Sequence, residues 1–165
     1  MILNLNSTFL NEKADLTFDY TLDLTSFELL AGEFPFKKPI RIYGKVSQKT
    51  GITELNATAE FEFFTKCDRC LKEIAKQYNV TLKNILVKTL SSEDSEELLL
   101  IEDEKLDLDE LAISNIILNI SMKHLCVENC KGLCSICGKS LELGDCLCNK
   151  KTVDPRLESL KSFFE

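Results

Sequence analysis

The feature that most constrains this chain is a run of closely spaced cysteines between residues 126 and 148, which reads CVENCKGLCSICGKSLELGDCLC. Six of the eight cysteines lie in this run, and the other two form a separate pair at Cys67 and Cys70. Thiolates a few residues apart can hold one metal ion from a single tight turn, and a second such turn completes a tetrahedron around it. Four short-spaced pairs therefore predict tetrahedral zinc sites.

The last four cysteines, in the pattern C-x2-C-x8-C-x-C, can form a local site. Gly138 directly follows Cys137, the second cysteine of this pattern. This glycine supports the prediction, because the residue that leaves such a turn often has a positive φ, which glycine adopts without strain. The other four cysteines form two pairs more than fifty residues apart, so a shared ion would connect the middle of the chain to its C-terminal part. The predicted ligands are Cys134, Cys137, Cys146 and Cys148 for the local site, and Cys67, Cys70, Cys126 and Cys130 for the long-range site.

Other uses of the cysteines remain open. Disulfides need an oxidising compartment, and the opening residues MILNLNSTFL lack the basic stretch and long apolar run of an export signal, so we expect thiols instead. A thioredoxin-like redox motif needs a strand followed by a helix, which neither C-x2-C pattern indicates. Cysteines that are simply buried in the core and bind no metal would account for isolated cysteines better than for four short-spaced pairs. His124 could replace a cysteine as a ligand, although a lone histidine beside such a cluster is more often a polar neighbour.

Alternation of apolar and polar residues predicts a β-sheet. The length of 165 residues and the apolar content of 44% suffice for a domain of ordinary size. No run approaches the roughly eighteen apolar residues of a membrane span. Alternation predicts strands at residues 18–24 and 78–90 and a hairpin of residues 40–46 and 52–65 around a turn at 48–51. In the second arm, Ala59, Phe61 and Phe63 share one face, as a sheet with one wet face requires.

A helix is predicted to begin at Asp107, because Glu110 follows three residues later as in a capping box. Its apolar residues keep helical spacing at Leu108, Leu111, Ala112, Ile116 and Ile120. We also predict a solvated loop at residues 91–97, an edge strand at 98–101 and a short final helix that begins at Asp154-Pro155.

These elements predict an α+β fold in two parts. Residues 1–125 should form an antiparallel β-sheet or partial barrel packed by one or two helices. Residues 126–165 should form a zinc-binding segment followed by the C-terminal helix.

Charge is distributed unevenly along the chain. The formal net charge is −7, but residues 93–110 contain ten acidic residues and one lysine. Cations gather instead in residues 37–50 and 66–88, where they could contact phosphates, although a solvated face is the alternative. The acidic segment could bind a basic protein or only keep the chain soluble. The candidate RNA contacts are Arg41, Lys45, Lys49, Arg69 and Lys72.

Several of these motifs together resemble the YceD family, the large ribosomal RNA subunit accumulation proteins. They are CDRCL, an acidic segment before an aliphatic helix, LC-x3-CKGLC-x2-CG, a C-x-C pair and DPR-x3-L, and they cover the chain from about Ile40 onward. Ser121, His124 and Ser135 stand where the family pattern has proline, which affects local turns and no cysteine. The resemblance implies a role in accumulation of large-subunit (23S) ribosomal RNA and in biogenesis of the large ribosomal subunit, in bacteria and plastids. It implies no defined reaction.

The residues themselves argue against catalysis. The chain has one histidine, no glycine-rich phosphate loop and no metal-binding helix motif with a carboxylate base. A zinc ion held by four thiolates has no open position for water. We therefore expect a cytoplasmic, non-enzymatic factor that binds ribosomal RNA or a basic ribosomal protein of the large subunit. The alternative is a zinc- or redox-responsive regulatory binding module, and the sequence leaves the oligomeric state open.

Overall fold

The computed structural model describes residues 1–6, 8, 15–29, 32–88, 98–101, 103–144 and 146–148. The predicted loop at residues 91–97 and the predicted helix that begins at Asp154 lie outside these residues. The chain divides into two compact units, which we call the sheet unit (Met1–Thr65 and Ile74–Met122) and the cysteine unit (Lys66–Glu73 and Lys123–Glu165). No helix in the described ranges is long and apolar enough to cross a membrane.

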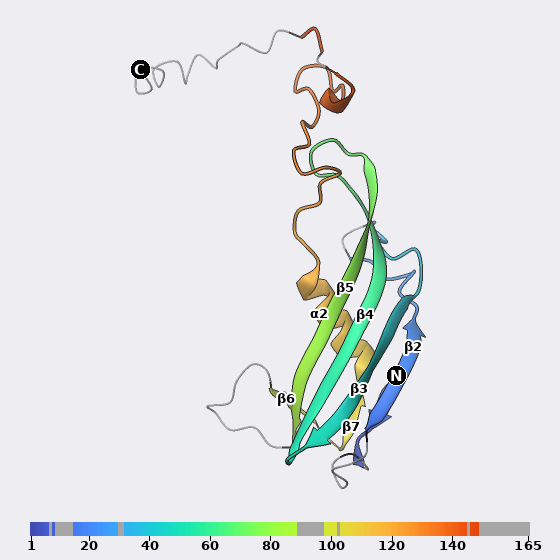
Figure 1. The fold of residues 1–165 in the computed structure, drawn as a ribbon. Coiled ribbons are helices and arrows are strands. Elements are labelled where there is room, and N and C mark those ends of the chain that lie inside the picture. The colour runs from blue at the N-terminus through green and yellow to red at the C-terminus, as the bar shows by residue number, and fades with distance from the viewer. Residues whose placement is uncertain are drawn as a thin grey trace, which may run out of the picture. The chain divides into compact units, whose positions relative to one another are not determined.

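The sheet unit is built on five strands in the order β2-β3-β4-β5-β6 (Figure 1). β3 pairs antiparallel with both β2 and β4, whereas the edge strand β6 pairs parallel with β5. The fold class is thus confirmed as α+β, with an open, mixed sheet whose parallel edge pair was not predicted. The strands are β2 (Leu16–Leu22), β3 (Ile40–Lys49), β4 (Ile52–Lys66), β5 (Glu73–Val87) and β6 (Leu98–Leu100).

The β3–β4 hairpin closes through a two-residue turn. Lys49 lies opposite Ile52, and the residues between them, Thr50 and Gly51, have φ angles of 50° and 81°. Positive φ at both central positions gives the turn a twist that matches the right-handed twist of the strands. The hairpin was predicted, but β3 continues to Lys49, so the turn is shorter than the predicted one at residues 48–51.

Gly44 lets β3 and β4 come unusually close together. It lies opposite Ala57, and a Cβ atom at Gly44 would stand 2.4 Å from the backbone oxygen of Asn56 and 2.5 Å from the Cα of Ala57. Real Cβ atoms do not approach other heavy atoms so closely. Glycine in the middle of this strand is therefore a requirement of the pairing.

The helix α2 (Leu108–Asn119) begins where the sequence predicts it. The side chain of Asp107 accepts hydrogen bonds from the backbone N–H groups of Asp109 at 3.0 Å and Glu110 at 3.5 Å, which confirms the predicted N-cap. Directly before α2, strand β7 (Lys105–Asp107) pairs antiparallel with β1 (Ile2–Asn4). On the helix, Leu108, Ala112 and Ile116 are buried and Leu111 is half-buried, as is Ile120 at the C-cap.

The hydrophobic core lies between α2 and one face of the sheet. The three residues predicted to share a face of β4 are buried in it: Ala59, Phe61 and Phe63. The Phe61 ring stacks on Tyr78 with centroids 5.4 Å apart, and Phe36 meets the edges of Phe61 and Phe63 at 5.6 and 5.8 Å. Every member of this core cluster belongs to the sheet unit.

Candidate metal centres

The two C-x2-C turns of the cysteine unit have the same backbone hydrogen bonds. In the first turn, the N–H of Leu71 donates to the carbonyl of Cys67 at 2.9 Å, and the N–H of Cys67 donates to the carbonyl of Lys72 at 2.8 Å. The second turn repeats this pattern from Gly138 to Cys134 at 2.8 Å and from Cys134 to Lys139 at 2.9 Å. The shared geometry presents both cysteines of each turn toward the same point.

In both turns the residue after the second cysteine has a positive φ. Gly138 has φ 70°, as its position in the sequence predicts. Its counterpart Leu71 has φ 60° and a side chain that is 62% exposed. An exposed leucine thus occupies a left-handed backbone position that glycine adopts without strain, and no sequence signal predicted it.

The first cluster joins the turn at residues 67–70 to the segment that contains Cys126 and Cys130. Its four sulfur atoms all lie within 4.8 Å of one another. The Sγ atoms of Cys67 and Cys130 are 3.8 Å apart, and those of Cys70 and Cys126 are 3.6 Å apart. Four sulfurs bonded to one zinc ion at about 2.3 Å have tetrahedral edges of about 3.8 Å. A disulfide needs about 2.05 Å, so these separations fit a metal site, and all eight cysteines are free.

The second cluster is local in sequence and more open to solvent. The sulfur atoms of Cys134, Cys137, Cys146 and Cys148 also lie within 4.8 Å of one another. A β-bridge between Leu133 and Ser140 closes the turn, and the short helix η1 (Leu141–Leu143) follows it. Cys134 is buried and Cys137 is exposed, whereas the first cluster contains two buried cysteines, Cys67 and Cys130. Each set of four thiols fits the donor set that zinc prefers.

Opposite pKa shifts divide the thiols of the first cluster. Burial raises the pKa of Cys67, but backbone N–H groups of Arg69, Cys126 and Cys70 outweigh it and lower the pKa to about 6. Burial raises the pKa of Cys130 to about 12, and the neighbouring thiols add to this rise. In the metal-free chain, Cys67 therefore ionises more readily than Cys126 or Cys130, whose pKa values burial raises.

The second cluster shows the same division. Backbone N–H groups of Cys137 and Ile136 lower the pKa of Cys134 to about 6. The thiol of Cys137 and then burial raise the pKa of Cys148 to about 12. The first cysteine of each C-x2-C turn is thus prepared to bind a metal as a thiolate, which is the form that coordinates.

His124 lies beside the first cluster and outside both groups of potential ligands in the described residues. It is buried, and its backbone N–H donates to Asp68 Oδ2 at 2.6 Å. Asp68 returns a bond from its own N–H to the carbonyl of His124 at 2.9 Å. Asp68 and Arg69, the two residues inside the first turn, were not predicted to support the site as they do here.

The predicted RNA contacts fall into two groups. Arg41, Lys45 and Lys49 are exposed at every fourth position of β3, so they share a face of the sheet. Arg41 pairs with Asp19 at 2.7 Å, and Lys45 pairs with Asp15 at 3.4 Å.

Arg69 and Lys72 belong to the cysteine unit, where the guanidinium of Arg69 donates to the carbonyl of Cys130 at 2.7 Å. Two of the three β3 cations therefore already have carboxylate partners, and Arg69 has a structural one. Binding of RNA by these five residues stays a prediction.

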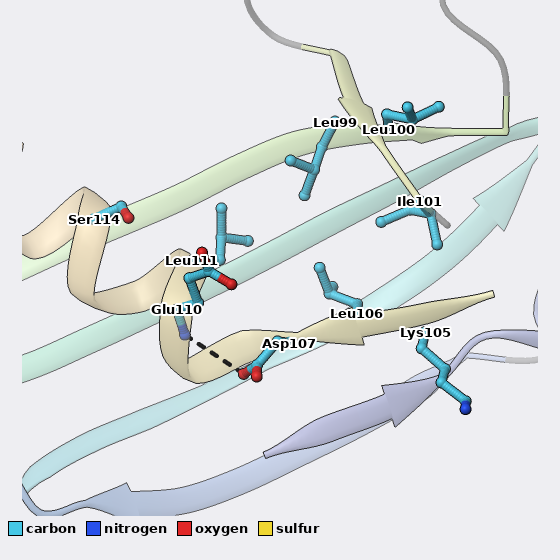
Figure 2. Close-up of a pocket in the computed structure, with 9 residues that line it drawn as sticks. All are labelled: Leu99, Leu100, Ile101, Lys105, Leu106, Asp107, Glu110, Leu111 and Ser114. Atoms are coloured by element: carbon cyan, nitrogen blue, oxygen red, sulfur yellow. Dashed lines mark hydrogen bonds between the residues drawn. The ribbon is translucent and has the colours of Figure 1, made fainter. Parts of the chain in front are cut away.

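The sheet unit also contains a cavity of about 440 Å³ beside β6, β7 and α2 (Figure 2). Figure 2 shows mostly aliphatic side chains around it, with the carboxylate of Asp107 bonded to the N–H of Glu110. That carboxylate caps α2 and so has a structural task. The lining residues are Leu99, Leu100, Ile101, Lys105, Leu106, Asp107, Glu110, Leu111 and Ser114.

A chain with two four-cysteine clusters and a separate small α+β core defines a class of protein with the donor sets of closed, structural metal sites. The chain belongs to the family described as "Large ribosomal RNA subunit accumulation protein YceD", which matches residues 55–164. This match confirms the resemblance found in the sequence, and the matched range contains all eight cysteines. Comparison with curated proteins and with solved structures found no match.

Proposed function

We propose that this protein is a non-enzymatic zinc-binding factor required for accumulation of large-subunit (23S) ribosomal RNA and for biogenesis of the large ribosomal subunit. It acts in the cytoplasm by binding ribosomal RNA or a basic ribosomal protein of the large subunit. The observation that carries the proposal is the family match, whose range includes both cysteine clusters. Zinc bound there supplies cross-links within the cysteine unit and leaves no position for a substrate.

Metal content is the first test of the proposal. Elemental analysis of the reduced, purified chain should find two zinc ions per molecule. Replacing Cys67 and Cys70 with serine should lower the content to one ion, because each cluster needs four thiolates. A content of one ion that the two substitutions leave unchanged would restrict metal binding to the second cluster.

The cellular role is tested by depletion and complementation. Depleting the protein in its own host should lower the ratio of large-subunit to small-subunit ribosomal RNA. The wild-type chain should restore this ratio, and the Cys67→Ser/Cys70→Ser variant should fail to do so. An unchanged ratio after depletion would refute the proposed role.

Binding to RNA and binding to a protein are distinguished by two measurements. Contact between β3 and phosphates should make affinity for ribosomal RNA fragments fall with salt, with a log–log slope of roughly −0.7 per contact on single strands. Charge reversal at Lys45 and Lys49 should then flatten the slope. An unchanged slope, combined with recovery of a basic ribosomal protein from nuclease-treated extract, would identify that ribosomal protein, and not RNA, as the binding partner.

A regulatory role is the second candidate, and the exposure of Cys137 favours it, because this thiol can be reached by oxidants and chelators. A metal-responsive module should release its partner when zinc is removed and bind it again when zinc returns. A purely structural site should lose binding without full recovery, because folding and metal binding are coupled.

A further inference from the structure

The two residues enclosed by the first C-x2-C turn bind the opposite half of the first cluster. The backbone N–H of Asp68 donates to the carbonyl of His124 at 2.9 Å, and the backbone N–H of His124 donates to Asp68 Oδ2 at 2.6 Å. His124 lies two residues before Cys126. Arg69 donates from Nη1 to the carbonyl of Cys130 at 2.7 Å. One residue therefore fixes the chain just before the first distant cysteine, and the next residue fixes the second distant cysteine itself.

Gly132 brings the two segments into close contact at the same place. A Cβ atom at Gly132 would stand 3.1 Å from the backbone oxygen of Arg69, and its φ of 75° is one that glycine adopts without strain. The turn at residues 67–70 thus contacts the segment of residues 124–132 at three places, His124, Cys130 and Gly132. Because these two segments are more than fifty residues apart in sequence, the covalent chain between them does not fix the distance between them.

From this geometry we infer that Asp68 and Arg69 are positioning residues for the metal of the first cluster, an inference that rests on the proposed metal binding. Neither side chain is a ligand. Their hydrogen bonds hold the Cys67/Cys70 turn in register with Cys126 and Cys130, so that four sulfurs converge at separations near a tetrahedral edge. Groups that orient ligands typically change metal affinity by about 10- to 100-fold when they are removed.

Cobalt(II) titration of the full-length, reduced chain tests this inference, because thiolate-to-cobalt absorption reports on each tetrathiolate site. The signals are assigned with Cys67→Ser/Cys70→Ser and Cys146→Ser/Cys148→Ser variants, which each lack one cluster. Asp68→Ala and Arg69→Ala should weaken cobalt binding at the first site by about 10- to 100-fold and leave the second site within a factor of two.

Conservative and control variants separate positioning from loss of charge. Asp68→Asn keeps an oxygen acceptor for the His124 N–H and should bind cobalt within a few-fold of wild type. Glu128→Ala and Lys131→Ala remove one acidic and one basic side chain that are exposed near Cys130, and both should bind like wild type.

Three results would overturn the inference. They are unchanged first-site affinity in Asp68→Ala and Arg69→Ala, equal weakening at both sites, and failure of Asp68→Asn to rescue binding. If the wild-type chain itself forms no tetrathiolate cobalt complex at the first site, the proposed metal function fails instead, and the two failures are thereby distinguished.

Discussion

At the scale of single residues, two of the three glycines of the cysteine unit, Gly132 and Gly138, form a matched pair. Gly132 and Gly138 have φ angles of 75° and 70°, but only a Cβ at Gly132 would meet a neighbour, the backbone oxygen of Arg69. Gly138→Ala should cost only the backbone strain, about 1–2 kcal/mol. Gly132→Ala should cost more and should weaken the first metal site selectively. Site-resolved chelator competition measures both effects, and equal effects on the two sites would contradict the role of the Arg69 contact.

Leu71 allows the opposite experiment, in which a strained position is relaxed. Leu71→Gly should leave the first site as stable as in wild type or up to about 1 kcal/mol more stable, because relief of left-handed strain exceeds the added freedom of the unfolded chain. Leu71→Ala is the control, since it keeps a Cβ and therefore the strain. Zinc release rates in excess chelator give the comparison. A faster release in Leu71→Gly would show that the leucine side chain stabilises the turn.

At the scale of elements, the sequence predicts local features well. Asp107 and Glu110 predict the start of α2 correctly, and alternation along residues 52–65 predicts the buried face of β4. Both predictions use patterns among residues close in sequence. The parallel pairing of β6 with β5 and the pairing of β1 with β7 were missed, because strands of three residues carry too short a pattern and their partners are distant.

The hairpin depends on the close pairing at Gly44. Gly44→Ala should destabilise the sheet unit by about 3 kcal/mol, because the new methyl group overlaps backbone atoms that cannot move without breaking the β3–β4 ladder. Gly51→Ala is a suitable control, since Gly51 has a positive φ but open space around its Cβ position, and it should cost about 1–2 kcal/mol. Urea unfolding followed by circular dichroism gives both values, and equal losses would contradict the packing argument.

At the scale of the whole molecule, the described parts of the two units differ in how much apolar surface they bury. The core cluster belongs to the sheet unit. In the described part of the cysteine unit, the buried side chains are those of Cys67, His124, Cys130 and Cys134. Because the described part of this unit buries so little apolar surface, we predict that the unit depends on a bound metal for folding.

Metal removal should therefore affect the units unequally. Chelator under reducing conditions should abolish amide protection against hydrogen exchange in residues 66–73 and 123–144, because the cross-links there are lost. Protection in β3, β4 and α2 should persist, because aliphatic and aromatic packing holds these elements. Equal loss in both units would show that the sheet also needs metal.

The site was more predictable than its supports. The spacing of the cysteines predicts both groups of four that the fold brings together. The supporting contacts of Asp68, Arg69 and Gly132 could not be predicted, because hydrogen bonds between residues more than fifty positions apart leave no periodic pattern in a sequence.

The long sequence separation between the two cysteine pairs of the first cluster also has a consequence during protein synthesis. Cys70 leaves the ribosome 56 residues before Cys126, which at about 5–20 residues per second is an interval of about 3–11 s. During this interval the first pair of thiols has no partner pair and is open to oxidation or to a competing metal. The β3–β4 hairpin can form in the same time, so we predict that any metal cross-link at this cluster is added late, to a sheet that has begun to fold.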